Sequence, residues 1–301
     1  GIALDIRGAA EPALEAFDTA QSLFAASVGE SDPDVAFLHH NRGIWYEQHG
    51  DYPAAERAYR RAIRVYRQTG GEGGEAIAKT YSNLGVILYR LNDLGGALQH
   101  WHQSLRILIS TYGPDHPVVA TVRGNIGSAY SDLARYDDAL AHFEPALRTL
   151  GGPADRRIAN IVQNMGVVYD RQERYDDARA AHEEALAIRR SLYDGPHPDI
   201  ANSLHNLAVV HHDQNQSRTA LRLLRQSLAM FRAVWGERHP DVAEAHRTIG
   251  RILYEQGDVE AAVQSLIRAV VANRAPATEA GANRARATGR AAPVRELLAA
   301  G

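Results

Sequence analysis

The 301-residue chain contains no cysteine, which excludes a disulfide framework, a thiolate zinc site and a cysteine nucleophile. It also lacks any run of 18 apolar residues, the length that a helix needs to cross a bilayer. A strong charge of either sign is missing as well, because the formal net charge is only -3. Such a chain has no general attraction to nucleic acid or to anionic lipid. We therefore expect a cytoplasmic protein that binds neither membrane nor nucleic acid directly.

The chain does contain a repeat of about 42 residues, whose first residue we take to be an alanine. Small residues recur at the eighth, twentieth and twenty-seventh places of each unit. They let two antiparallel helices approach closely, since larger side chains would push the helices apart. Apolar residues at helical spacing and a short polar turn complete a pattern of helix, turn, helix. The six units begin at Ala36, Ala78, Ala120, Ala159, Ala201 and Ala243.

The units resemble the tetratricopeptide repeat, and their linkers are similar to those of the kinesin light chain type. Two examples are Gly-Pro-Asp-His-Pro-Val-Val-Ala at 113–120 and Gly-Glu-Arg-His-Pro-Asp-Val-Ala at 236–243. The resemblance implies an all-α fold, a right-handed superhelical α-solenoid of antiparallel helix pairs. We expect a partial repeat and linker over residues 1–35, six repeats over 36–271, and an Ala/Arg-rich C-terminal cap or tail over 272–301.

The linkers also have a physical explanation. Gly ends one helix, Pro prevents its continuation, and we expect an Asp or Ser just ahead of the Val-Ala pair to cap the next helix. The linker histidines His116, His197 and His239 lie one unit apart, too far to share a metal, so a structural role is favoured. In the third unit, Pro145 falls well inside the expected second helix, which we expect to be shortened or kinked.

The clearest functional signal is an asparagine at the sixth place of five successive units, where side chains point into the concave face. Asn is a mediocre helix former, so its recurrence in mid-helix needs another reason. An amide side chain both donates and accepts, so a row of them can bond the main chain of an extended peptide. The residues are Asn41, Asn83, Asn125, Asn164 and Asn206, followed by Thr248 in the last unit.

The family resemblance implies the same role, because Asn at this place contacts the main chain of the bound peptide. The alternative is that these asparagines bond within or between units and stabilise the stack. The groove between them is expected to be neutral and partly apolar. The basic clamp of the chaperone-binding branch is not expected, since Lys or Arg is missing from most matching places. Lys79, His205, Arg247 and Arg251 complete the predicted peptide-binding set.

Enzyme motifs are not convincing. Residues 73–80 imitate a phosphate-binding loop, but Ala78 replaces its second glycine and the stretch joins two helices instead of following a strand. The histidine-rich stretches at 100–102 and 211–213 place adjacent side chains in different directions and lack an i, i+4 pair. We expect no catalytic residue, no metal and no cofactor.

The leading hypothesis is a non-catalytic scaffold that binds a protein or peptide segment through the asparagine ladder. The alternative is the C-terminal ligand-sensing array of a larger bacterial signalling ATPase or transcriptional regulator. It arises because the repeat, projected backwards, places Gly1 in the middle of a first helix. We therefore expect a fragment with an effector domain upstream. A second copy of the chain, docking through exposed solenoid ends, is a further candidate partner.

Overall fold

The computed structural model describes residues 15–20, 22–24, 27, 32–70, 74–152 and 155–273. Most of the expected partial repeat and nearly all of the expected C-terminal cap or tail lie outside these residues. Every regular element of the described part is an α-helix, which confirms the all-α class. None of the helices described there is both long and apolar enough to cross a membrane.

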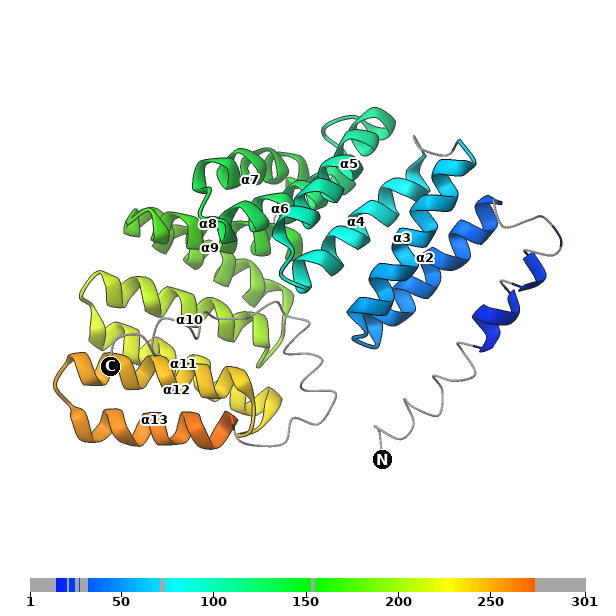
Figure 1. Cartoon of the computed structure of the whole chain (residues 1–301). Helices are drawn as coiled ribbons and strands as arrows, with labels where there is room; N and C mark the ends of the chain where they lie inside the picture. Colours follow the sequence, from blue (N-terminus) through cyan, green and yellow to red (C-terminus); the bar gives the residue numbers. More distant parts are fainter. Residues whose placement is uncertain are drawn as a thin grey trace. The chain divides into compact units, whose positions relative to one another are not determined.

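The helices alternate between the first and the second helix of a repeat (Figure 1). The pairs α2 and α3, α4 and α5, α8 and α9, α10 and α11, and α12 and α13 each pack as a hairpin. The first helices are α2 (Pro33–Gln48), α4 (Glu75–Arg90), α6 (Pro117–Asp132), α8 (Arg156–Arg171), α10 (Pro198–Asp213) and α12 (Pro240–Glu255). The second helices are α3 (Tyr52–Gln68), α5 (Leu94–Tyr112), α7 (Tyr136–Leu150), α9 (Tyr175–Leu192), α11 (Ser217–Trp235) and α13 (Val259–Asn273).

The contacts divide the chain into two compact units, each containing several repeats, which are called the first unit and the second unit from here on. The division falls inside α6, between Ala129 and Tyr130. In the first unit α3 packs on α4, and the first helices α2 and α4 also touch. In the second unit α9 packs on α10 and α11 on α12, and the first helices α8 and α10 touch. Within each unit, successive hairpins are therefore stacked with their first helices adjacent.

Four eighth-place glycines, Gly43, Gly85, Gly166 and Gly250, lie in close contact with the second helix of the same hairpin. A Cβ atom at Gly85 would lie 2.5 Å from Nε1 of Trp101, and one at Gly166 would lie 2.7 Å from Cε1 of His182. Both rings are buried. Because real Cβ atoms do not approach other atoms so closely, any larger residue would displace a ring from the core. The predicted reason for small residues at this place is confirmed.

The first helices that follow a linker containing Gly and Pro begin earlier than the sequence analysis expected. α10 and α12 start at Pro198 and Pro240, and their N-caps are His197 and His239. Each imidazole Nδ1 accepts a hydrogen bond of 3.1 Å from the backbone N–H two residues later. The expected cap just ahead of the Val-Ala pair was wrong. Pro at the first helical position needs no amide partner, so the residue before it becomes the cap.

The cap histidines also stack on aromatic rings at the ends of the preceding helices. Ring centroids lie 3.4 Å apart for Tyr193 and His197, and 4.9 Å apart for Trp235 and His239. His116 has the same arrangement, with a bond from a backbone N–H and a stacked tyrosine. These contacts confirm the structural role of the three linker histidines.

Pro145 lies inside α7, which spans 15 residues. The other second helices with both neighbouring linkers are longer, at 17 residues in α3, 18 in α9 and 19 in α5 and α11. A proline in a helix interior removes one backbone hydrogen bond and crowds the preceding turn. The shortened helix that the sequence predicted is present.

Candidate peptide-binding surface

The five sixth-place asparagines all lie on first helices and are all half-buried. In the first unit, α2 carries Asn41 and α4 carries Asn83, and these helices touch. In the second unit, α8 carries Asn164 and α10 carries Asn206, and these helices also touch. Asn125 belongs to α6. In each of the two touching pairs, both helices therefore carry an asparagine at the same place of the repeat.

The amides differ in what they already bond. Asn83 donates to the hydroxyl of Tyr59 over 3.5 Å, which is the stacking role that the alternative interpretation requires. Asn41, Asn125 and Asn206 form no side-chain hydrogen bond with any residue that the structure describes. None of their amide atoms is both buried and unpartnered, so these amides reach solvent. They keep their donors and acceptor for a ligand.

Fifth-place histidines connect neighbouring first helices. His40 Nδ1 lies 2.8 Å from Thr80 Oγ1, which joins α2 to α4. His205, a member of the predicted peptide-binding set, has its Nε2 3.5 Å from Thr248 Oγ1 on α12. His205 is therefore in contact with the stack as well as being half-buried at the surface.

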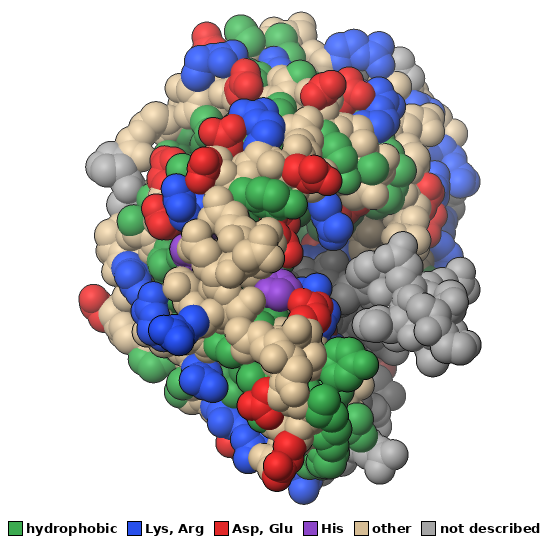
Figure 2. Space-filling view, turned by 90° about the vertical axis from the view of Figure 1, so that its left-hand side faces the viewer, with side chains coloured by type: hydrophobic (Ala, Val, Ile, Leu, Met, Phe, Trp, Pro, Cys, Tyr) green, Lys and Arg blue, Asp and Glu red, His purple; other side chains and the backbone are tan. Residues whose placement is uncertain are grey.

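The charged members of the predicted set are exposed or partly exposed. Lys79 Nζ lies 2.5 Å from a carboxylate oxygen of Glu75 on the same helix. Arg247 pairs with Glu244, also on its own helix. Arg251 is exposed and forms no ion pair with the described residues. Figure 2 shows basic and acidic side chains interspersed over the face that it draws, in keeping with the small net charge.

A buried arginine that the sequence analysis missed joins three helices of the second unit. Arg189 of α9 is only 4% exposed. It donates to Asn160 Oδ1 of α8 over 2.8 Å and to Ser203 Oγ of α10 over 2.6 Å. It also bonds Gln163 Oε1 of α8. These bonds hold α8 and α10, the helices of Asn164 and Asn206, in a fixed relation to each other.

A sequence signal for Arg189 was present in the repeat itself. A cation at a place that is apolar or aromatic in four of the other five repeats indicates a polar contact across helices. The same place in the other repeats is occupied by Tyr66, Leu108, Leu150, Phe231 and Asn273.

Comparison with solved structures supports the fold. BtubC (BKLC) from P. vanneervenii is 22% identical, with a TM-score of 0.63 over 75% of this chain and 91% of that chain. The apo form of RapI is 16% identical, with a TM-score of 0.67 over 87% of this chain and 90% of that chain. The TPR-like repeats of a putative kinesin light chain from Podosopora anserina are 18% identical, with a TM-score of 0.55 over 64% of this chain and 93% of that chain. At these identities the likeness shows the fold alone.

Family models match most of the chain. One described as tetratricopeptide repeat covers residues 6–68, 76–150 and 157–233, and another of the same description covers residues 41–105 and 205–278. No curated protein matches the sequence. The helical hairpins, the small residues at their contacts and these matches agree, and the chain belongs to the tetratricopeptide repeat family.

Proposed function

We propose that this chain is a non-catalytic scaffold that binds an extended peptide or protein segment along its first helices. The observation that carries the proposal is the set of open amides at Asn41, Asn125 and Asn206. Each amide offers one acceptor and two donors, the complement of a peptide C=O and N–H. Recognition of this kind holds the main chain of a ligand without demanding one sequence.

The neighbouring ninth places favour apolar side chains on the ligand. These places are half-buried in the first five repeats and exposed at Arg251, and they lie one helical turn from the sixth places, so they border the same surface. Burial of apolar area supplies binding energy there, and the amide bonds fix the position of the ligand main chain. The ninth-place residues are Ile44, Val86, Ser128, Val167 and Val209, with Arg251 in the last unit.

The charged members of the set are proposed to contact acidic groups of the ligand. The ion pairs that Lys79 and Arg247 form on their own helices are exposed. Such pairs are worth only about 0 to 1 kcal/mol, so a ligand carboxylate can replace the glutamate partner. Arg251 needs no such exchange. His205 is proposed to donate or accept beside Asn206.

The alternative of a sensing array in a signalling ATPase or transcriptional regulator stays a hypothesis. It requires the same binding surface and adds an effector domain outside this chain. The sequence of the complete gene would test it, because such an array follows a nucleotide-binding or winged-helix domain.

Replacing the three open asparagines is expected to weaken peptide binding without unfolding the chain. Linear peptides would first be selected on the wild-type chain by phage display, and their affinity measured by fluorescence anisotropy. In the triple variant Asn41→Ala, Asn125→Ala, Asn206→Ala, we expect Kd to rise about tenfold or more, since each lost bond contributes about 0.5 to 1.5 kcal/mol. Alanine is a better helix former than asparagine, so the helices are retained.

Gln226→Ala is the matched control, because Gln226 is an exposed amide on the second helix α11. It should leave the affinity within about twofold. Unchanged affinity in the triple variant, with circular dichroism like that of the wild type, would contradict the proposed role of the asparagines.

A further inference from the structure

The first unit contains a basic pocket of about 430 Å³ between the second helices α3 and α5. None of the sixth-place asparagines lines it, so it is separate from the candidate peptide-binding surface. The residues that line it include three arginines and no carboxylate, and the nearest acidic groups are Glu56, which pairs with Arg60, and Asp93. It is lined by Arg60, Ile63, Arg64, Arg67 and Gln68 of α3, Tyr81 and Leu84 of α4, and His100 of α5.

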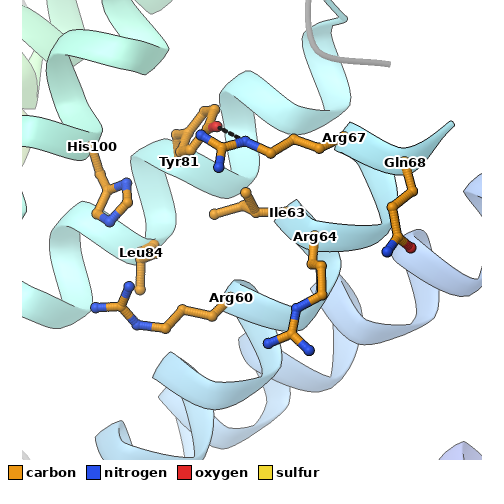
Figure 3. Close-up of a pocket in the computed structure, with 8 residues that line it drawn as sticks. All are labelled: Arg60, Ile63, Arg64, Arg67, Gln68, Tyr81, Leu84 and His100. Carbon is orange, nitrogen blue, oxygen red and sulfur yellow. Dashed lines mark hydrogen bonds between the residues drawn. The ribbon is translucent and has the colours of Figure 1, made fainter. Parts of the chain in front are cut away.

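Figure 3 shows how these side chains are arranged. Ile63 and Leu84, both buried, lie between the arginines and form an apolar floor. Arg60 extends past Leu84 on the side of His100, and Arg67 extends toward Tyr81. The Nε of Arg67 donates to the Tyr81 hydroxyl over 3.1 Å. Cationic groups therefore border an apolar floor from two sides.

The charges of the pocket favour an anion. Arg60 pairs with Glu56 on its own exposed helix face through Nε, at 2.8 Å, which leaves its terminal nitrogens available. Arg64 is exposed and forms no ion pair with the described residues. Burial, followed by the charges of Arg60 and Arg67, lowers the pKa of His100 against the smaller opposing effects of Asp93 and Glu56. The His100 ring is stacked on Tyr81, and its Nδ1 is buried without a hydrogen-bond partner.

The repeat supplies an internal comparison for this pocket. Helix α9 is the second helix of the first complete hairpin in the second unit, as α3 is in the first unit. Helix α11 corresponds in the same way to α5. If the packing of repeats required the basic residues of the pocket, the same residues would recur on α9 and α11. Counting from the first residue of each repeat, the places of Arg60, Arg64, Arg67 and His100 are taken by Glu183, Ala187, Arg190 and Leu223. The combination is thus particular to this pocket.

We propose that the pocket binds a small organic phosphate monoester. Its phosphoryl group would be bound by the arginines that line the pocket, because the guanidinium fork matches phosphate oxygens in pairs. Its carbon skeleton would lie against the accessible parts of Ile63 and Tyr81, which an inorganic phosphate cannot use. The volume lies within the range of about 300 to 1,000 Å³ that is usual for small-molecule sites. This site adds a small-molecule ligand to a chain whose proposed function is peptide binding.

Isothermal titration calorimetry of the full chain tests the proposal with phenyl phosphate and inorganic phosphate as probes. We expect saturable binding of one phenyl phosphate per chain, about fivefold or more tighter than inorganic phosphate, because only the ester reaches the apolar floor. Arg64→Gln should weaken phenyl phosphate binding about tenfold. The matched control is Arg57→Gln, an exposed arginine of the same helix outside the lining, which should change affinity less than about twofold.

Several results would overturn the proposal. Phenyl phosphate that fails to saturate would exclude a formed site. Equal weakening in Arg57→Gln and Arg64→Gln would show diffuse attraction to a basic helix. Equal affinity for inorganic and phenyl phosphate would exclude the apolar floor. A phosphotyrosine peptide that binds more than about tenfold tighter than phenyl phosphate would identify the ligand as a protein segment instead of a small molecule.

Discussion

Lowering the pH from 7.5 to 4.5 is expected to remove about 2 to 3 kcal/mol of stability from the second unit through one residue, His182. This histidine is 1% exposed, and burial, followed by the charge of Arg189, lowers its pKa to about 4. In the unfolded chain its pKa is near the ordinary value of 6.5. The unfolded state therefore binds the proton first. The stabilising contribution is complete above pH 6.5 and is lost as the pH falls toward 4.

The variant His182→Leu should remove most of this acid sensitivity. Leucine suits the site because the chain already packs Leu266 at the matching place against Gly250. Hydrogen exchange of backbone amides in α8 and α9, at pH 7.5 and 4.5, reports on the second unit alone. His39 and Asp170 are present in both proteins, so their titration cancels in the comparison. If the variant lost as much protection as the wild type between the two pH values, His182 would not be the sensitive group.

Gly85→Ala is expected to destabilise the first unit by about 2 to 3 kcal/mol, although alanine is the better helix former. The new Cβ would lie 2.5 Å from Nε1 of Trp101, whose indole is 2% exposed. This nitrogen also donates to the Ser82 carbonyl over 3.0 Å, so the ring cannot move without breaking a buried bond. Either the indole or the α4 backbone must shift. Urea denaturation followed by tryptophan fluorescence measures the loss.

Gly95→Ala is the matched control for this substitution. Gly95 lies in the first turn of α5, and a Cβ there would approach only Asp93 Oδ1, at 3.9 Å. We expect no loss, or a gain of about 0.5 to 1 kcal/mol from reduced backbone entropy in the unfolded chain. Equal destabilisation by both substitutions would show that the contact with Trp101 is not the cause.

Periodic features of the structure were predictable from the sequence because each unit repeats the same physical requirement. The small residues at helix contacts, the hairpins and the short α7 around Pro145 all belong to this class. Contacts that occur once were not predictable in this way. Arg189 bonds residues 26 and 29 positions earlier and 14 later, and nothing local to the sequence identifies those partners.

In the candidate site, too, the repeated feature was predictable from the sequence and the individual contacts were not. The row of asparagines is visible in the sequence because it recurs at one place. The sequence does not show which of these asparagines keep their amides unbonded, since the contact of Asn83 with Tyr59 depends on side chains of two different helices. The basic pocket was missed for a similar reason. Its arginines recur on one face of α3, but their meeting with His100 of α5 depends on how two hairpins pack.

Recognition of a ligand main chain is tested most directly with backbone-methylated peptides. One selected peptide would be compared, by fluorescence anisotropy, with copies methylated at single backbone nitrogens, on the wild-type chain and on the triple asparagine variant. We predict that methylation at some positions weakens wild-type binding about tenfold, because it removes an N–H that donates a hydrogen bond to an asparagine side-chain oxygen. The same methylation should have little further effect on the variant, since the two changes remove one interaction. Methylated copies that all bind the wild-type chain as tightly as the parent peptide would contradict main-chain recognition by the asparagines.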